Sequence, residues 1–280
     1  MKITLAISLI LIASITGLSQ GKINVMSFNI RYDNPKDADD QWKFRKENLT
    51  SILPYYDVEI CGMQEVLYSQ AEDIKNLLPD YKYVGKGRTD GKLEGEFSPI
   101  FYDATKITLL ETKTFWLSPT PNTPSKGWDA ALPRVVTWAK LKLKTGTLQP
   151  FYVFNTHFDH LGANARAESA KLLLKKVKEI AGTNIAIITG DFNATPLEEP
   201  IQIIKDKLMD ARRLCKTPHF GPENSTFNGF DTKEVEGRLI DFIFTNSYKV
   251  KVMKHATLSN TWGGHFASDH HAVMARFDFN

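Results

Sequence analysis

Short runs of apolar residues recur along the chain and alternate with more polar segments. Each run has the length and the β-branched or aromatic content of a β-strand. The runs that open with INVM, FYVF and IAII are apolar on both faces, which predicts buried strands, whereas VVTWAKLKL alternates, which predicts a half-exposed strand. The predicted strands are Ile23–Ile30, Val58–Gln64, Pro99–Asp103, Val135–Leu143, Phe151–His157, Ile185–Thr189, Leu239–Phe244 and His271–Phe279.

Helical periodicity lies between some of these runs. In segment 163–182 apolar residues recur at spacings of three and four, and Gly182 is a typical residue at the end of a helix. A second helix is predicted from Asp40 to about Leu53, and a third over Gln70–Leu78. Strands and helices alternate to the last residue, so the pattern predicts an α/β fold with a single domain over residues 21–280.

One long segment shows neither pattern. Residues 118–133 are rich in proline and small polar side chains, which predicts an ordered loop over one end of the domain. Trp116, just before this loop, is expected to pack in the interior, and the sequence leaves the role of Trp128 open.

The first 20 residues have the order of a secretory signal peptide. Lys2 precedes the apolar segment 5–15, and small and polar residues follow. A membrane span takes about 20 apolar residues, so this segment is too short for one. Cleavage near Gln20 or Gly21 would leave a periplasmic or secreted chain without a transmembrane segment. No cysteine lies near that point, so a lipid anchor is not expected.

Composition limits the classes of partner. The 280 residues carry a formal net charge of +3, and basic and acidic residues are interspersed. A dedicated nucleic-acid binder would carry a denser basic stripe. Of the two cysteines, Cys61 lies inside an apolar run and is expected to be a small buried residue, so we expect it and Cys215 to be unpaired.

Polar residues gather where the predicted strands begin or end. They are Asn29, Glu65, Asn155, His157, Asp191, Asn193, Asp241, Asp269 and His270. Each alone has a structural explanation: Asp191 as a helix cap, His157 as a structural histidine, Asn29 as part of a turn. No single one of these explanations covers the whole set. Each carboxylate in it, if buried, also needs a partner. If the strands share a sheet edge, these residues meet where α/β sheets bind ligands.

The residue types at these positions indicate phosphate-ester hydrolysis. Glu65 and Asp269 are hard oxygen ligands and Asn29 offers a carbonyl oxygen, a set that suits Mg²⁺, with Mn²⁺ as a substitute. His270 and Arg134 can face an anionic substrate. A metal on the ester oxygens, a base for water and donors for developing charge would complete such a site.

Six motifs carry a resemblance to a known superfamily. They are SFNIR around Asn29, QEV around Glu65, NTHFDH around His157, GDFNATP around Asp191, LIDFIF around Asp241 and SDHHAV around His270. In this order they resemble the metal-dependent endonuclease/exonuclease/phosphatase superfamily, which includes deoxyribonuclease I, over essentially all of the mature chain. The resemblance implies a four-layer α-β-β-α sandwich, in which two mixed β-sheets pack face to face with helices outside.

The resemblance also implies the metal ligands and the base. Glu65 would be the principal metal ligand, with Asn29 and Asp269 in or next to the coordination sphere. Asp191 would orient and deprotonate the attacking water with the help of Asn193.

It further implies the groups that contact the substrate. His270 would contact the scissile phosphate, Asp241 would fix its orientation, and His157 would be a second phosphate contact. Arg134 and Asn155 are predicted to bind substrate; a surface ion pair is the alternative for Arg134.

One residue departs from the pattern of the exonuclease III-like members of this superfamily. Exonuclease III-like members often carry an aspartate two positions after the asparagine, where this chain has Arg31. This departure and the export signal argue against abasic-site repair. The segments GEFSPIFYD and GWDAALPR are similar to a bacterial exported subgroup.

The sequence therefore predicts an exported, monomeric, Mg²⁺-dependent phosphoesterase that cleaves a phosphate mono- or diester. The modest charge favours a small phosphorylated substrate over a long nucleic acid. One alternative is a glycosidase that uses two carboxylates, Glu65 and Asp191. The other is a surface binding protein of the same fold without catalysis.

Overall fold

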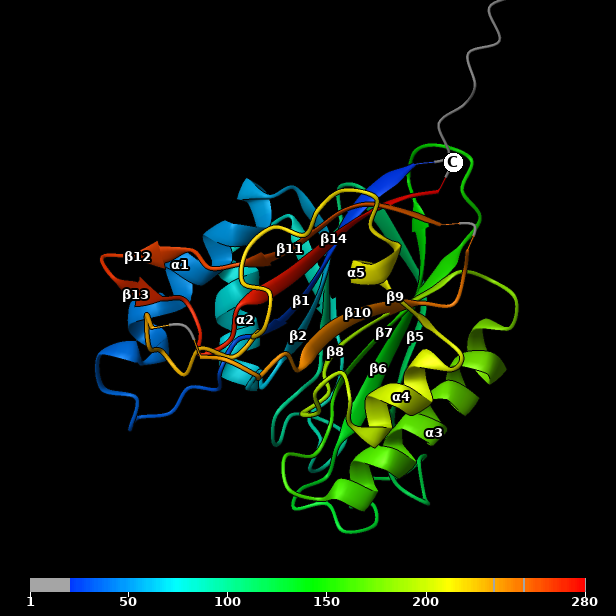
Figure 1. Cartoon of the computed structure of the whole chain (residues 1–280), viewed down its shortest axis with the longest axis horizontal. Helices are drawn as coiled ribbons and strands as arrows, with labels where there is room; N and C mark the ends of the chain where they lie inside the picture. Colours follow the sequence, from blue (N-terminus) through cyan, green and yellow to red (C-terminus); the bar gives the residue numbers. More distant parts are fainter. Residues whose placement is uncertain (1–20, 234, 249, 280) are drawn as a thin grey trace, which may run out of the picture.

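The apolar runs assemble into two six-stranded sheets that pack face to face (Figure 1). The computed structural model describes residues 21–233, 235–248 and 250–279, so the predicted signal peptide, residues 1–20, lies outside the described residues. Across the first sheet the strands are β11 (Lys251–Leu258), β14 (Ala272–Asp278), β1 (Lys22–Asn29), β2 (Val58–Gln64), β4 (Ile100–Asp103) and β3 (Tyr81–Val84). Across the second they are β5 (Ile107–Trp116), β6 (Val135–Leu143), β7 (Phe151–His157), β8 (Ala186–Asp191), β10 (Asp241–Thr245) and β9 (Met209–Asp210).

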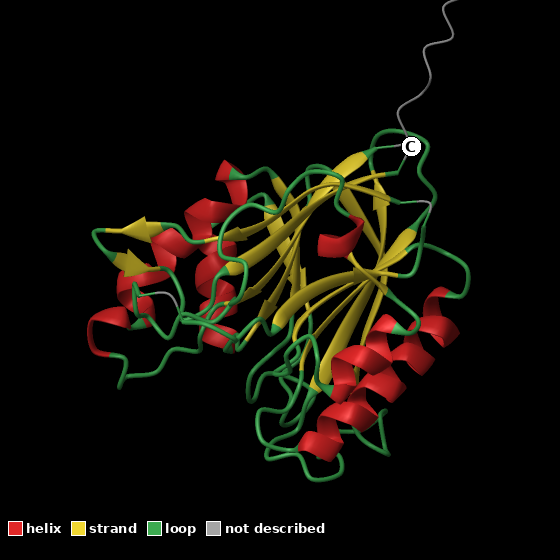
Figure 2. Ribbon diagram, viewed as in Figure 1, coloured by secondary structure: helices red, strands yellow, loops and turns green. Residues whose placement is uncertain are grey.

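Helices cover the outer face of each sheet (Figure 2). The first sheet packs against α1 (Trp42–Tyr55) and α2 (Tyr68–Leu77), and the second against α3 (Ala163–Ala181) and α4 (Glu199–Lys205). The short elements are η1 (Ala38–Asp40), α5 (Ala211–Leu214) and the hairpin of β12 (Thr261–Trp262) and β13 (His265–Phe266). Among the described residues, no helix has the length and apolarity that a membrane span requires.

Three apolar layers separate the four layers of secondary structure. Between the sheets, Val25 and Ile60 of the first cluster with Val153 and Ile187 of the second, and all four are fully buried. The other two layers lie between each sheet and its helices. Both sheets are mixed, because each contains one parallel pair among antiparallel neighbours. The predicted α-β-β-α sandwich is therefore confirmed.

The predicted helices form, and their ends differ from the prediction by a few residues. The inner face of α1 buries Trp42, Leu49, Ile52 and Leu53, which recur at helical spacing. At the end of α3, Gly182 has a φ of 58°, a conformation that glycine adopts without steric cost. The spacing of apolar residues was sufficient to predict these helices, because each helix packs against a sheet with only one of its own faces.

Edge strands were harder to predict. The sequence does not predict β5 and β11, in which exposed positions interrupt the apolar residues. The half-exposed assignment of β6 is wrong for residues 135–139, which are all buried. Val136 and Trp138 pack in the outer layer beneath α3, while Ala139 packs between the sheets.

Predictions about the long loop, Trp116 and the cysteines are confirmed. Residues 118–133 form a loop without helix or strand. Trp116 is buried, and its Nε1–H donates to the carbonyl oxygen of Arg88 at 2.8 Å. Cys61 and Cys215 are both free, and Cys61 is buried.

The parallel pair in each sheet fixes the position of the polar strand ends. β1 runs parallel to β2, and β7 runs parallel to β8, so both members of each pair end at one edge. Beside them, β14 and β10 run antiparallel and begin at that edge. Residues at the ends of the parallel strands therefore lie next to residues at the starts of the antiparallel ones.

Gly62 allows the two sheets to approach closely near this edge. A Cβ atom at Gly62 of β2 would overlap the side chains of Thr189 and Asn155 of the second sheet. We predict that Gly62→Ala lowers the free energy of unfolding by about 1–3 kcal/mol, the usual cost of overpacking. Urea denaturation measures this change, and an unaltered midpoint and slope would contradict the close approach.

Candidate active site

Asp191, the last residue of β8, has a polar neighbour on each side. His157 at the end of β7 pairs with Asp191 in the parallel ladder, and Asp241 at the start of β10 pairs with it in the antiparallel ladder. In the first sheet, Asn29 ends β1 and Glu65 follows the last residue of β2. The strand ends thus bring together residues that are far apart in the sequence.

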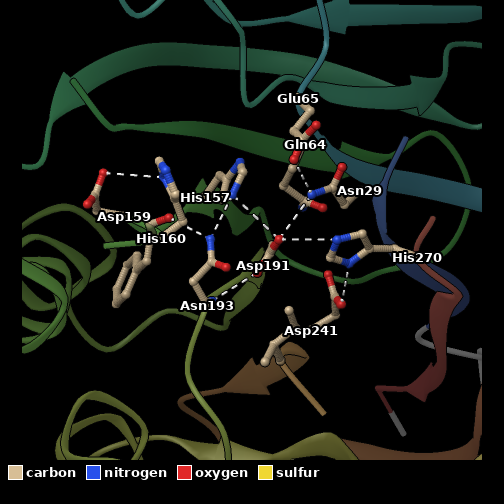
Figure 3. A network of polar contacts seen from close by, with 12 residues as sticks. Asn29, Gln64, Glu65, His157, Asp159, His160, Asp191, Asn193, Asp241 and His270 are labelled. Atoms are coloured by element: carbon tan, nitrogen blue, oxygen red, sulfur yellow. Dashed lines mark hydrogen bonds and ion pairs between the residues drawn. The ribbon is translucent and has the colours of Figure 1, made fainter. Parts of the chain in front are cut away.

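The Asp191 carboxylate is the centre of the polar network (Figure 3). Its Oδ2 accepts a hydrogen bond from Asn29 Nδ2 at 3.0 Å. The same oxygen lies 3.5 Å from His157 Nε2 and 3.8 Å from His270 Nε2. Its Oδ1 accepts the backbone N–H of Asn193 at 2.9 Å. Asp191 is 1% exposed, so the Asn29 amide, the Asn193 N–H and His270 replace water around a buried charge.

The explanation of Asp191 as a helix cap is wrong. Its bond to the Asn193 N–H closes a turn, and the next helix, α4, begins only at Glu199. Asn193 has a φ of 46°, a left-handed conformation in which asparagine is enriched. This turn directs Asn193 Nδ2 to His157 Nε2 at 2.9 Å and to the Phe158 carbonyl oxygen at 3.0 Å.

His270 is a buried cation. Burial alone would lower its pKa, but the charge of Asp241 and the hydrogen bond from His270 Nδ1 to Asp241 Oδ2 at 2.9 Å oppose this effect. With the charges of Asp191 and Asp269, they raise the pKa of His270 to about 10. The predicted pairing of Asp241 with His270 is confirmed, and the imidazole is protonated at neutral pH.

The two carboxylates that flank His270, those of Asp191 and Asp241, are both buried but differ in their position relative to the central cavity. Burial, with a contribution from the charge of Asp241, raises the pKa of Asp191 to about 6. Asp191 is therefore mostly ionised at neutral pH, and it lines the central cavity together with His270. Asp241 is 2% exposed and does not line that cavity.

His157 is neutral in this environment. Burial, together with the nearby positive charges of Arg134 and Arg88, lowers the pKa of His157 well below its usual value. Its Nε2 accepts the Asn193 amide, so the ring proton lies on Nδ1. That Nδ1 atom is buried and has no partner among the described residues.

Glu65 and Asp269 form the other acidic part of the site. Glu65 Oε1 accepts Asn29 Nδ2 at 3.1 Å, and Oε2 accepts the Tyr32 N–H at 3.2 Å. Burial raises the pKa of Glu65, and the charge of Asp269 adds to this effect. Asp269 Oδ2 lies 3.8 Å from Arg31 Nε, and both carboxylates line the central cavity.

Asn29 lies between the two acidic groups. Its Nδ2 donates to both Glu65 and Asp191, while its Oδ1 accepts the Arg31 N–H at 3.0 Å. Asn29 is thus next to Glu65, as expected. Direct ligation of a metal by its carbonyl oxygen stays a prediction.

One group among the described residues has the spacing of a metal site. The ligand atoms of Asp191, Asp241 and His270 all lie within 4.8 Å of one another. These residues are buried, and the His270 Nδ1 atom already donates to Asp241. This group and the pair of Glu65 and Asp269 are therefore two alternative positions for a cation.

The site opens into a central cavity of about 360 Å³. Seven of the predicted site residues line it: Glu65, Arg134, His157, Asp191, Asn193, Asp269 and His270. Its wall also contains residues that the sequence analysis did not assign: Arg31, Tyr32, Arg88, Glu96, Leu132, His160, Phe227, Arg238 and Ile240. Of these, Glu96 lies in the segment GEFSPIFYD, one of the two segments that are similar to a bacterial exported subgroup.

Arg134 has one unused donor beside the cavity. Its Nε donates to Asp159 Oδ1 at 3.2 Å, and its Nη2 lies 2.9 Å from His160 Nδ1. Its Nη1 is buried without a partner among the described residues. Because Arg134 is 4% exposed, the alternative of a surface ion pair is wrong. Substrate binding by Arg134 stays a prediction.

The structure contradicts substrate contact by Asn155. Its Oδ1 accepts from Gln64 Nε2 at 2.7 Å and from Thr189 Oγ1 at 3.0 Å. Its Nδ2 donates to the carbonyl oxygens of Met63 at 2.6 Å and Pro99 at 2.8 Å. Asn155 is fully buried and lies outside the cavity wall, so it joins the two sheets.

The fold and the family comparison agree. A four-layer sandwich with carboxylates and histidines at the strand ends defines a class of hydrolases that act on phosphoester bonds. The model of the endonuclease/exonuclease/phosphatase family matches residues 26–270, so the chain belongs to this family.

Solved structures of similar proteins extend this comparison. An endonuclease/exonuclease/phosphatase family protein from Bacteroides thetaiotaomicron is 38% identical, with a TM-score of 0.88 and coverage of 93% of this chain and 98% of that chain. A mannosyl-6-phosphatase from the same organism is 38% identical, with a TM-score of 0.87 and coverage of 92% and 100%. The human nocturnin catalytic domain, 19% identical with a TM-score of 0.72 and coverage of 94% and 95%, shares the fold.

The pair of His270 and Asp241 predicts a pH-dependent stability. The pKa of His270 rises from 6.5 to about 10 on folding, so its contribution is fully present below about pH 6.5 and is lost as the pH approaches 10. Asp241→Asn removes the main cause of this rise. We predict that the stability difference between wild type and this variant shrinks from pH 7 to pH 10.

Urea denaturation across this range measures the difference. Asp191, with a pKa of about 6, is largely ionised at these pH values and contributes little to the slope. A difference that stays constant from pH 7 to pH 10 would contradict the assignment of His270 as the buried cation.

Proposed function

We propose that this chain is a metal-dependent phosphoesterase that hydrolyses a small phosphorylated substrate, with a sugar phosphomonoester as the favoured class. The observation that carries the proposal is the pair of Asp191 and His270. A carboxylate and a cationic imidazole lie 3.8 Å apart and line one cavity. They are a base for water and a donor for the charge that develops on a phosphoryl group.

The contacts of Asp191 support its role as the base. Asn29 and the Asn193 N–H fix both carboxylate oxygens, so the group has a defined direction toward the cavity. In the proposed reaction, Asp191 accepts a proton from the attacking water as the water oxygen bonds to phosphorus. The bond from phosphorus to the sugar oxygen breaks, and the sugar oxygen leaves with a proton from solvent. His270, oriented by Asp241, donates a hydrogen bond from Nε2 to a phosphoryl oxygen.

A metal ion fits Glu65 and Asp269 better than the group of Asp191, Asp241 and His270. Mg²⁺ takes oxygen ligands and keeps several waters, which requires access to the cavity, and both Glu65 and Asp269 line it. Asp241 does not, although its Oδ1 is buried without a partner among the described residues. The cationic His270 already compensates the two aspartates. When bound, the metal would supply charge stabilisation for the phosphoryl oxygens.

The volume and the charge of the cavity favour a small anionic substrate. Its volume of about 360 Å³ is at the lower end of the usual range for small-molecule sites. Arg134 and Arg238 in its wall add positive charge for an anionic substrate. One similar protein, 38% identical, is a mannosyl-6-phosphatase, which favours a phosphorylated sugar here. Export is part of the proposal and rests on the sequence of residues 1–20.

The contacts of Asn29 argue against the glycosidase alternative. A glycosidase needs its two carboxylates on either side of the scissile bond, with the sugar between them. Here Asn29 Nδ2 lies 3.1 Å from Glu65 Oε1 and 3.0 Å from Asp191 Oδ2, so the amide group fills that space.

Turnover of phosphate esters tests the proposal. We predict that the mature protein hydrolyses D-mannose 6-phosphate, that EDTA abolishes this activity and that Mg²⁺ or Mn²⁺ restores it. Asp191→Asn should lower kcat by about 100- to 10,000-fold, the usual contribution of a positioned base. Glu65→Gln should raise the Mg²⁺ concentration needed for half-maximal rate.

Asp206→Asn, an exposed aspartate that does not line the cavity, is the control and should match wild type. A full rate in EDTA, or a full rate for Asp191→Asn, would contradict the proposal. The same assay with bis(p-nitrophenyl) phosphate and single-stranded DNA measures the preference for monoesters.

A further inference from the structure

An ion pair forms part of the cavity wall away from the proposed metal ligands. Arg88 Nη1 donates to Glu96 Oε2 at 2.7 Å, and Arg88 Nη2 donates to Glu96 Oε1 at 2.8 Å. The two side chains are 10% and 18% exposed, and both line the cavity. A buried ion pair is expensive to desolvate and contributes little to stability on balance. Its position in the wall of the cavity therefore calls for a functional explanation.

The loop that carries this pair is well ordered by internal hydrogen bonds. The Arg88 N–H donates to the Glu96 carbonyl oxygen at 3.1 Å, and the Thr89 N–H donates to that of Glu94 at 3.1 Å. Trp116 Nε1 donates to the Arg88 carbonyl oxygen at 2.8 Å and ties the loop to β5. The pair is thus fixed before a ligand arrives, which lowers the entropic cost of binding.

The pair keeps hydrogen-bonding capacity toward the cavity. A carboxylate has about four acceptor sites, and Arg88 occupies two of those of Glu96. Arg134, which lines the same cavity and a small recess shared with Arg88 and Glu96, has its buried Nη1 donor unused among the described residues. Acceptors and a donor at one place match adjacent hydroxyl groups, each of which donates and accepts.

The acceptor oxygens of Glu96 narrow the class of ligand. The oxygens of an ionised phosphodiester are acceptors only and cannot donate a hydrogen bond to this carboxylate, so a second phosphate group does not match it. The hydroxyl groups of a neutral polyhydroxylated group can donate to it.

We propose that Arg88 and Glu96, together with the Nη1 atom of Arg134, form a subsite that binds adjacent hydroxyl groups of the sugar of a phosphorylated sugar substrate. This inference rests on the proposed function, since the phosphoryl group would lie at His270 and Asp191. Arg88 and Glu96 then select the substrate, while the residues at the strand ends perform the hydrolysis.

Paired assays with two phosphomonoesters test the subsite. D-mannose 6-phosphate carries the hydroxyl groups, and p-nitrophenyl phosphate lacks them. We predict that Glu96→Gln lowers kcat/KM for the sugar phosphate by about 10- to 100-fold, the usual effect of losing a hydrogen bond to a charged group. The loss should fall mainly on KM, and kcat/KM for p-nitrophenyl phosphate should change less than about twofold.

Two further variants separate binding from folding. Glu94→Gln changes an exposed glutamate of the same loop outside the cavity wall and should leave both activities unchanged. Arg88→Gln/Glu96→Gln replaces the ion pair by two neutral amides and leaves no unpaired charge, so it keeps the test valid if Glu96→Gln does not fold. This double variant should show the same selective loss.

The outcomes distinguish the two proposals. An equal loss on both substrates, or no loss on the sugar phosphate, would overturn the subsite and leave the proposed function intact. A wild type that hydrolyses p-nitrophenyl phosphate and leaves the sugar phosphate intact would overturn both the subsite and the sugar-phosphate class of the proposed function, while metal-dependent ester hydrolysis would stand. A wild type that hydrolyses neither substrate in Mg²⁺ or Mn²⁺ would contradict the proposed function itself.

Discussion

The amide group of Asn29 joins the two sheets at the site. Its Nδ2 donates to Glu65, which follows a strand of the first sheet, and to Asp191, which ends a strand of the second. Two carboxylates that share a donor repel each other unless other charges compensate them. The cation His270 forms an ion pair with Asp191 at 3.8 Å. Among the described residues Glu65 forms no ion pair, although the charge of His270 also lowers its pKa. This asymmetry gives the two carboxylates different chemistry.

In this fold, the strand ends and the loops contribute different residues to the site. Strand ends supply Asp191, Asn29 and Glu65, whose relative positions are fixed by the ladders and by the fully buried residues between the sheets. Loops supply Arg88 and Arg134, which line the same cavity; Arg134 directly precedes β6. Loop residues can vary without disturbing the sheets, so we infer that the strand ends perform hydrolysis and the loops select the substrate.

The sequence predicted what depends on local pattern and on motifs. Apolar runs located the central strands, and the motifs predicted the layers and the pairing of Asp241 with His270. The sequence did not predict the roles of residues that depend on tertiary contacts. Asn155 ends an apolar run like the other site residues, yet it faces the opposite sheet and uses its amide to join β7 to β2. Arg88 lies in a loop of charged and glycine residues, and only the folded loop turns it toward the cavity.

The position of a bound metal tests the division between Glu65 and Asp191 most directly. Crystals grown with Mn²⁺ and measured near the manganese absorption edge give an anomalous difference map. The account predicts a peak beside the carboxylates of Glu65 and Asp269, open to the cavity. A peak enclosed by Asp191, Asp241 and His270, with none beside Glu65, would contradict it.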